Sequence, residues 1–287
     1  MSATPEAFYV AEGDGLRSTE LTRGPWDPGS QHAGPPAALL GRAIERLPAG
    51  DGMQVGRVTL EILRPVPIAP VAVSAEIVRP GRRVELVEAA LMAGGETLVR
   101  ARAWRLRVGE AALPRGVSGT EVPAVEPASE SVLHPARTPP PPEDCEQGEF
   151  FPTGESVGYH TAMEYRFARG GFLEPGPATV WMRMRHPLVA GEEPTPLQRV
   201  LTAADSGNGV SAALDWRRYL FINVDLSVHL ARMPEDEWVC LDAITIAEPT
   251  GVGLTDTALL DLRGPIGRAA QTLLVAPRDP ASEAATQ

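Results

Sequence analysis

Residues 196–209 have the sequence Pro196-Leu-Gln-Arg-Val-Leu-Thr-Ala-Ala-Asp205-Ser-Gly-Asn-Gly209. Apolar residues recur there at helical spacing and form one face, at Leu197, Val200, Leu201 and Ala204. The stretch therefore predicts a helix that runs into a polar turn, with the carboxylate of Asp205 beside the apolar face. Gly207 and Gly209 are expected to have positive φ angles, which end or kink a helix and let backbone and ligand approach closely. The simpler alternative is a solvated Asp in a polar turn.

A second helix is predicted after a loop rich in Gly and Pro that ends at Gln31-His-Ala-Gly34. Pro35 and Pro36 fit its first turn, where N–H groups have no partner within the helix. Its apolar positions form a broad face, and Pro48 with Gly50 stops it; these positions are Ala37, Leu39, Leu40, Ala43, Ile44 and Leu47. The start of this helix favours a developing oxyanion or a phosphate.

Strands are predicted around both helices, because runs rich in Val, Ile and Leu alternate with turn residues. They cover residues 6–11, 58–63, 71–78, 84–92 and 98–108 in the first half, and 159–167, 179–186, 220–230, 237–247, 253–262 and 267–275 in the second. Each half thus has an antiparallel sheet and a helix that need each other to bury their apolar surfaces.

The two halves resemble each other at a nearly constant separation along the chain. Residues 58–62 resemble 224–228, residues 71–75 resemble 239–243, and residues 86–91 resemble 254–259. A repeat of whole α+β units predicts two copies related by a pseudo-twofold axis, with a cleft between them. The expected domains are residues 1–109 and 158–287, joined by a Pro-rich linker at 110–157.

The composition limits the classes of partner. The chain has 287 residues, 43% of them hydrophobic, and a net charge of −11, which argues against a general attraction to nucleic acid. Arginines cluster at Arg79, Arg82 and Arg83, and at Arg217 and Arg218. Such clusters are more often solvated surface than a ligand site, but they are the candidates for a local phosphate site.

No cofactor or metal is expected. Cys145 and Cys240 lack the spacing of metal ligands and are predicted to be free thiols, and the five His residues match no zinc site. No apolar run is long enough to span a membrane, and the N-terminus does not have the pattern of a secretion signal. A cytoplasmic protein is therefore expected.

Three further polar residues are candidates for a site in the cleft. His32 could be a proton donor, a ligand contact or only a capping residue before the helix. Gln271 lies in an otherwise small and apolar strand, so it is either buried with partners for its amide or turned to solvent. Asn223 has the same two alternatives, and strand alternation places it on one face with Asp225 and Ser227.

These residues give the chain a resemblance to a known family. The resemblance rests on four segments: residues 31–39 at the first helix, residues 204–209 at the second, residues 223–227 in the following strand, and Gln271 in the last. In their order and spacing they resemble the double-hotdog acyl-CoA thioesterases of the type II, TesB-like kind. The resemblance covers nearly the whole chain and is weakest in the linker. It implies an α+β fold of two tandem hotdog units, each an antiparallel sheet wrapped around a long central helix.

The resemblance also implies catalytic residues. In the better-known members an Asp, a Thr or Ser, and a Gln hold the water that hydrolyses acyl-CoA, without a metal or a covalent enzyme intermediate. The Asp position matches Asp205 and the Gln position matches Gln271, whereas the hydroxyl position falls on Asn223. Asn is a departure from the family pattern, because an amide offers donors and acceptors different from those of a hydroxyl. Ser206 could substitute for it.

The resemblance places the thioester oxyanion near the start of the first helix. Backbone amides around His32, Ala33 and Gly34 are expected to stabilise it, together with Ser206 and Gly207 of the polar turn. Asp205 would then orient or deprotonate the attacking water.

Two hypotheses about function follow. The first is a thioesterase of lipid metabolism that hydrolyses a fatty acyl-CoA to free acid and CoA. The second is a non-catalytic acyl-CoA or lipid-binding protein on the same scaffold, favoured by Asn223 in place of the hydroxyl. A hotdog dehydratase is less favoured, because the helix before Asp205 contains no His. An acyl-CoA substrate and an internal pseudo-dimer are expected, while acyl length and further homo-oligomerisation stay open.

Overall fold

The computed structural model describes residues 5–13, 15–50, 52–109 and 139–278. Its N-terminal half begins with β1 (Tyr9–Glu12), β2 (Gly15–Ser18), the 3-10 turn η1 (Glu20–Thr22) and the helix α1 (Gly34–Arg46). Four long strands follow: β3 (Met53–Ile62), β4 (Pro70–Arg79), β5 (Val84–Ala93) and β6 (Glu96–Arg107). The predicted order of one helix and four strands is confirmed in this half.

The C-terminal half begins with η2 (Pro142–Asp144), β7 (Glu146–Gln147), α2 (Tyr159–Ala162), β8 (Met163–Gly171) and β9 (Glu174–Met184). The helices α3 (Pro196–Ala204) and α4 (Gly207–Val210) come next, followed by β10 (Tyr219–Asn223), β11 (Asp225–Leu230), β12 (Val239–Ala247), β13 (Val252–Asp261) and β14 (Gly264–Pro277). The prediction of a strand from residue 159 was wrong for its first residues, because residues 159–162 form α2. The Gly158 N–H donates to Thr161 Oγ1 at 3.1 Å and stabilises this helical turn.

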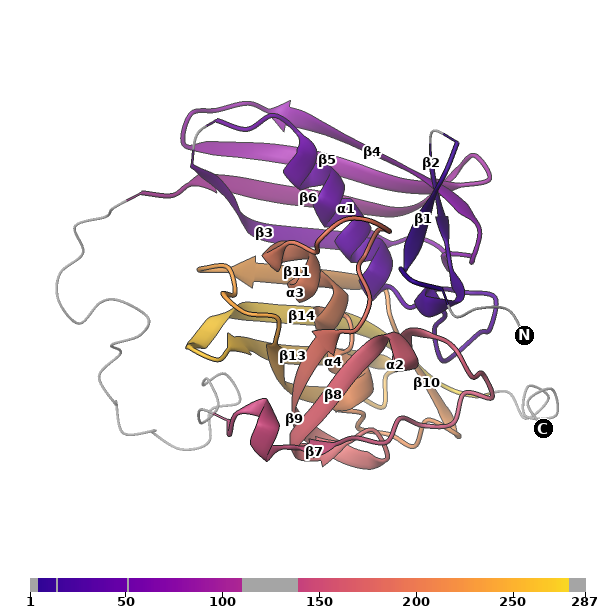
Figure 1. The fold of residues 1–287 in the computed structure, drawn as a ribbon. Helices are drawn as coiled ribbons and strands as arrows, with labels where there is room; N and C mark the ends of the chain where they lie inside the picture. The colour runs from indigo at the N-terminus through magenta and orange to yellow at the C-terminus, as the bar shows by residue number, and fades with distance from the viewer. Residues whose placement is uncertain (1–4, 14, 51, 110–138, 279–287) are drawn as a thin grey trace, which may run out of the picture.

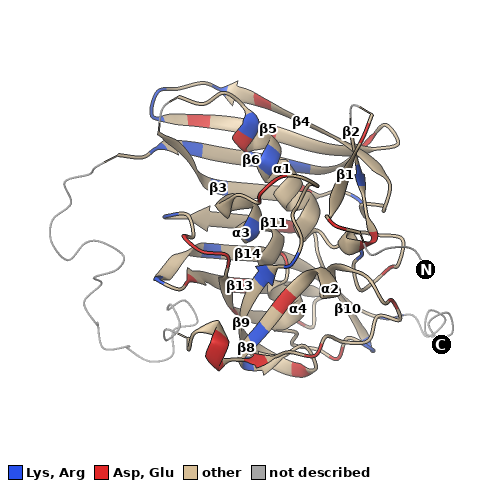
Figure 2. Cartoon of the chain, viewed as in Figure 1, with Lys and Arg blue, Asp and Glu red and all other residues tan. Residues whose placement is uncertain are grey.

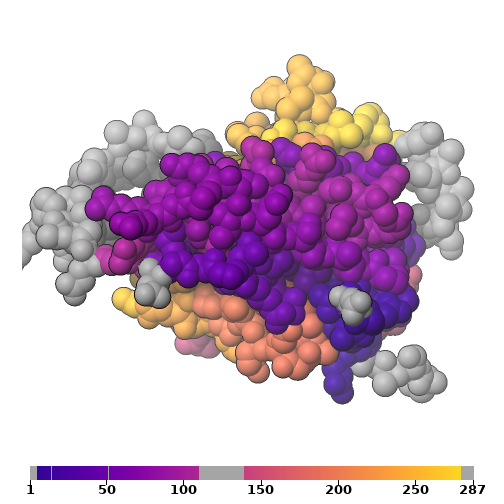
Figure 3. Space-filling view, turned by 90° about the horizontal axis from the view of Figure 1, so that it is seen from above, coloured from indigo at the N-terminus to yellow at the C-terminus, as the bar shows by residue number. Residues whose placement is uncertain are grey.

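All described strands belong to one antiparallel sheet, in the order β1-β2-β4-β5-β6-β3-β11-β14-β13-β12-β9-β8-β7, with β10 paired to β14 (Figure 1). The halves meet where β3 pairs with β11, and Val58 lies opposite Val228 in this pairing. Since β3 and β11 are equivalent in the predicted repeat, exchanging the two strands leaves their register unchanged. Seen from above (Figure 3), the indigo and purple N-terminal half has orange segments of the C-terminal half along one side and yellow segments along the other.

The longer helices lie on one face of the sheet and contact each other (Figure 1). α1 buries an apolar face that includes Leu39, Leu40 and Ile44, and it packs on β4 and β5. It also lies close to α3, because a Cβ added at Gly41 would stand 2.6 Å from Leu201 Cδ1. Contact with α1 and the sheet buries α3 almost completely.

A β-bulge divides the strand expected at residues 220–230. Asn223 pairs with Leu273 of β14, and Ser227 pairs with Ala270, so β10 and β11 contain one more residue than the facing part of β14. The extra residue reverses the alternation, so that Asn223 faces inward, whereas Asp225 accepts hydrogen bonds from the N–H and the hydroxyl of Thr272. The expectation that Asn223 shares a face with Asp225 and Ser227 was therefore wrong.

The glycines after α3 also differ from expectation, since neither Gly207 nor Gly209 has a positive φ. A Cβ added at Gly207 would lie 2.6 Å from Thr257 Oγ1 and 2.9 Å from Gln271 Oε1. A larger residue than Gly207 would not fit at this distance from β13 and β14. Glycine therefore allows α4 to begin here, shortly after the end of α3.

Two observations bear on the rest of the chain. In the described part of the expected linker, β7 pairs with β8 and Phe151 is buried, while residues 110–138 lie outside the described residues. None of the described helices is long and apolar enough to cross a membrane.

Candidate active site

Four predicted site residues meet at the end of α3. Asp205 directly follows this helix and is only 4% exposed. Asn223 reaches it from the end of β10, Gln271 from β14, and His32 from the loop before α1. The carboxylate is therefore buried at the junction of the two halves, and the alternative of a solvated Asp was wrong.

Both oxygens of the Asp205 carboxylate have a partner. Asn223 Nδ2 donates to Oδ1 at 2.8 Å, and His32 Nδ1 lies 3.0 Å from Oδ2. The bulge after Asn223 makes the first contact available, because it turns this side chain away from solvent. Fixed on both sides, the carboxylate has little freedom to rotate.

His32 Nδ1 has two neighbours that make opposite demands on it. The Gly34 N–H points at Nδ1 over 3.1 Å, which requires a lone pair there, whereas Asp205 Oδ2 requires a proton. One nitrogen cannot do both at the same time. Since a hydrogen bond to a carboxylate is stronger than one between neutral groups, the state with Nδ1 protonated is favoured. In that state the Gly34 N–H is available to another acceptor.

Tyr159 belongs to the site, although the sequence did not predict it. Its ring stacks on His32 with a centroid separation of 3.7 Å and an interplanar angle of 7°. Its hydroxyl donates to the Thr202 carbonyl at 2.7 Å and lies 3.0 Å from Ser206 Oγ. Burial raises the pKa of Tyr159, so the hydroxyl stays protonated and acts as a donor. No local sequence signal distinguishes a Tyr at the start of an expected strand.

Gln271 is buried with partners for both ends of its amide. Nε2 donates to the backbone carbonyl of Asp205 at 3.1 Å, and Oε1 accepts from the Asn208 N–H at 3.1 Å. The side chain therefore holds the turn between α3 and α4, and through that turn the position of the Asp205 carboxylate. The solvent-facing alternative for Gln271 was wrong, since it is 1% exposed.

The remaining predicted residues surround this centre. A Cβ added at Gly34 would overlap the carbonyl of Thr202, so the start of α1 presses directly on α3. Ser206 contacts the Tyr159 hydroxyl, and Ala33 lines a cavity together with Asp205. The structure thus brings together every residue that the sequence assigned to the site.

Two small cavities border the site, one lined by Asp205 and the other by His32. The cavity beside Asp205 has a volume of about 10 Å³ and is otherwise aliphatic, lined by Ala33, Ala37, Leu60, Ile62, Val99 and Leu226. The other has about 20 Å³ and is lined by His32 with Ser206, Asn208 and Gly209, and by Pro25, Trp26, Phe150, Phe151, Tyr159 and Phe172. Each holds at most about one water molecule, so a bound acyl chain requires side chains to move.

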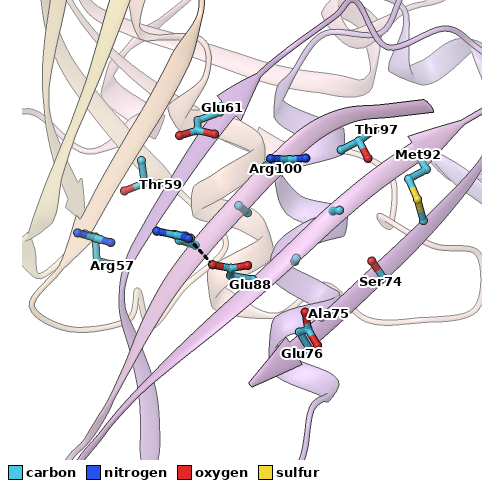
Figure 4. Close-up of a pocket in the computed structure, with 14 residues that line it drawn as sticks. Arg57, Thr59, Glu61, Ser74, Ala75, Glu76, Glu88, Met92, Thr97 and Arg100 are labelled. Carbon is cyan, nitrogen blue, oxygen red and sulfur yellow. Dashed lines mark ion pairs between the residues drawn. The ribbon is translucent and has the colours of Figure 1, made fainter. Parts of the chain in front are cut away.

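A much larger groove, of about 930 Å³, lies on the outer face of β3–β6 (Figure 4). Charged residues of both signs line it, among them Arg57, Glu61 and the ion pair of Glu88 with Arg102. Red and blue segments therefore lie next to each other on β5 and β6 (Figure 2). None of the predicted site residues lines this groove, so its size does not make it the candidate active site.

Two protein-family models match the two halves of the chain separately. A family model described as the acyl-CoA thioesterase N-terminal domain matches residues 22–106, and one described as the C-terminal domain matches residues 142–275. No curated protein matches the sequence significantly.

Solved structures share the fold at low sequence identity. A thioesterase II candidate from Thermobifida fusca YX has a TM-score of 0.68 and 18% identity, covering 94% of this chain and 96% of its own. A hot dog fold protein of unknown function from Alicyclobacillus acidocaldarius has a TM-score of 0.68 and 16% identity, covering 96% and 97%. The acyl-CoA thioesterase II TesB2 from Mycobacterium marinum has a TM-score of 0.61 and 16% identity, covering 88% and 92%. These similarities establish the hot dog fold.

The two domain models match consecutive segments that together make up most of the chain. The protein therefore belongs to the acyl-CoA thioesterase family and is a thioester hydrolase.

Proposed function

We propose that this protein hydrolyses a fatty acyl-CoA to the free acid and CoA, by means of a water molecule that Asp205 activates. The observation that supports this most is the buried Asp205 carboxylate, which Asn223 and His32 hold beside an aliphatic cavity. A buried carboxylate with one open side is suited to accept a proton from water. The cytoplasmic location stays a prediction from the sequence.

In the proposed reaction, water attacks the carbonyl carbon of the thioester while Asp205 takes up one of its protons. The C–S bond then breaks and the free acid forms, and the proton passes from Asp205 to the thiolate of CoA. Asn223 has a role compatible with this step, because Nδ2 donates to Asp205 while its Oδ1 can accept from the water. An amide in the hydroxyl position therefore retains the donor that orients the carboxylate.

We place the oxyanion of the tetrahedral intermediate at the start of α1. The helix dipole favours negative charge there, and the Gly34 N–H is available when His32 Nδ1 keeps its proton for Asp205. Ala33 lines the cavity beside Asp205, which supports this placement. Tyr159 and Gln271 act as positioning residues, the first through the His32 ring and the second through the backbone of Asp205.

We further propose that the fold is a tandem pair of hotdog units. The symmetric register of β3 and β11 supports this, as does the repeated order of helix and strands. The two central helices differ in length, with 13 residues in α1 and 9 in α3, where the break at Asp205 separates α4. The domain limits at 1–109, 110–157 and 158–287 stay a prediction.

The proposal is tested by release of free thiol from acyl-CoAs of short, medium and long chain. We expect Asp205→Asn to lower kcat by about 10²- to 10⁴-fold, because the variant keeps the shape of the side chain and loses the base. Asp256→Asn, on the outer face of β13, serves as the matched control and should retain activity. Thermal unfolding of both variants shows whether the fold is intact.

Undiminished turnover in folded Asp205→Asn would eliminate the Asp205 mechanism. Tight binding of acyl-CoA to the wild-type protein without thiol release from any chain length would instead favour the non-catalytic binding protein.

A further inference from the structure

The two cavities at the candidate active site differ in the side chains that line them. This difference indicates which end of the substrate lies in which cavity. Apart from Asp205, the cavity beside this residue is aliphatic, and it lies between α1, β3, β6 and β11 at the junction of the two halves. The cavity beside His32 is bordered by aromatic side chains that continue outward to the partly exposed Trp26. An acyl chain suits the first environment, and the second leads toward the surface.

Aromatic side chains that line the cavity beside His32 contact further aromatic rings outside it. Phe151 stacks on Trp26 with a centroid separation of 5.3 Å, and on Trp216 with a separation of 5.4 Å. Phe221 meets the edge of Trp26 at 5.4 Å. Aromatic residues make up only 5% of the chain, so their concentration at one mouth is notable. Flat rings of this kind bind heteroaromatic bases by stacking.

Three arginines, Arg217, Arg218 and Arg278, lie near these aromatic rings, which we call the aromatic mouth. The Arg278 guanidinium lies 5.4 Å from the centre of the Trp26 ring, and its Nε donates to the Trp216 carbonyl at 2.7 Å. The Arg217 guanidinium lies 5.3 Å from the centre of the Trp216 ring. The backbone N–H of Arg278 donates to the carbonyl of Arg218, whose guanidinium lies 6.0 Å from the centre of the Tyr219 ring.

Among the described residues, no carboxylate forms an ion pair with these arginines, although the Asp215 carboxylate accepts from the backbone N–H of Arg217 at 2.9 Å. Arg217 and Arg218 are exposed, and Arg278 is half-buried. Burial lowers the pKa of Arg278, the direction expected of a partly desolvated cation. In a protein with a net charge of −11, three cations beside aromatic rings, without a carboxylate partner among the described residues, form a local site suited to an anion.

We propose that Arg217, Arg218 and Arg278 bind the phosphates of CoA, with the nucleotide against the aromatic mouth and the acyl chain in the aliphatic cavity beside Asp205. The inference rests on the proposed hydrolysis of acyl-CoA and adds the direction in which the substrate lies. CoA has a diphosphate and a 3′-phosphate, which match a cluster of guanidinium groups. The cluster also offsets the general repulsion between an acidic protein and an anionic substrate.

The test compares two substrates that share the acyl group, acyl-CoA and the corresponding acyl-pantetheine, which has no phosphate. In the double variant Arg217→Gln with Arg218→Gln we expect KM for acyl-CoA to rise about tenfold or more, with kcat nearly unchanged. KM for acyl-pantetheine should stay as in the wild type. Arg278→Gln should act in the same direction, and because it also contacts Trp216, its thermal unfolding is measured alongside.

The matched control is the double variant Arg82→Gln with Arg83→Gln, which removes the same charge from an exposed turn between β4 and β5. Calorimetric binding of free CoA gives a readout independent of turnover, and the arginine variants should weaken it, more at low salt than at high salt. An equal rise of KM for both substrates, or an effect as large in the control, would overturn the proposal. If neither substrate is hydrolysed by the wild type, the proposed function fails, whereas CoA binding still tests the arginine site.

Discussion

At the scale of single residues, the site depends on which way Asn223 points. One inserted residue in the strand that contains it turns its amide inward to Asp205, at 2.8 Å. Without the bulge, alternation would turn this side chain to the outer face of the sheet. The amide of Asn223 thus places a hydrogen-bond donor within reach of the carboxylate.

We therefore expect Asn223→Ala to lower kcat by about 10²-fold, since it removes one donor from the carboxylate that we propose activates the water. Asn223→Ser restores a short donor at the same place and should recover most of the loss. Steady-state kinetics with one acyl-CoA, at matched thermal stability, measures both. Equal activity of the Ala variant and the wild type would show that the amide does not position Asp205.

At the scale of elements, the contact between α1 and α3 contains carboxylates with opposite pKa shifts. Glu45 of α1 accepts from Thr195 Oγ1 at 2.7 Å and from Gln198 Nε2 at 3.4 Å at the start of α3, and burial raises its pKa. Glu192, just before α3, accepts from Arg42, and this hydrogen bond lowers its pKa. The first carboxylate therefore favours the neutral form and the second the charged form.

Glu45 should make the fold less stable as pH rises. The unfolded chain releases the proton of this side chain near the usual pKa of 4.5, whereas the folded chain keeps it to higher pH, so stability is lost across that interval. We expect Glu45→Gln to be more stable than the wild type at neutral pH, and the difference to disappear below pH 4.5. Urea unfolding at both pH values measures this, with Glu193→Gln as the exposed control. A difference that does not change with pH would contradict the role of the raised pKa.

At the scale of the whole molecule, each half supplies contacts that the other half lacks. β11 pairs with β3 along the edge where the halves meet, and α1 packs on α3. In the candidate site, His32 of the N-terminal half contacts Asp205 of the C-terminal half. Among the described residues, neither half by itself contains all members of the candidate site.

Separate expression of residues 1–124 and 125–287 tests this dependence. We expect each fragment alone to lack a cooperative unfolding transition as a monomer, because an unpaired strand edge and an uncovered helix are exposed. Mixing the fragments should restore thioesterase activity. A C-terminal fragment that is monomeric and unfolds cooperatively by itself, as judged by ultracentrifugation and circular dichroism, would contradict the expectation.

Much of the fold could be predicted because its signals are local. Helical spacing with Pro35 and Pro36 predicted α1, turn residues separated the strands, and the internal repeat predicted two similar halves. The candidate site could be predicted in part, since Asp205 and Gln271 are polar residues in apolar surroundings. Tyr159 could not, because its role depends on a stacked ring and on a carbonyl in another element.

By itself, then, the sequence determined most of the elements and their repetition and indicated most residues of the candidate site, because periodicity and turn residues act over short stretches of chain. Only the tertiary structure decided that Asn223 faces Asp205, that Gln271 holds the backbone and not the carboxylate, and that His32 has two competing partners. These outcomes depend on one bulged residue and on distances between groups far apart along the chain, which no local pattern records.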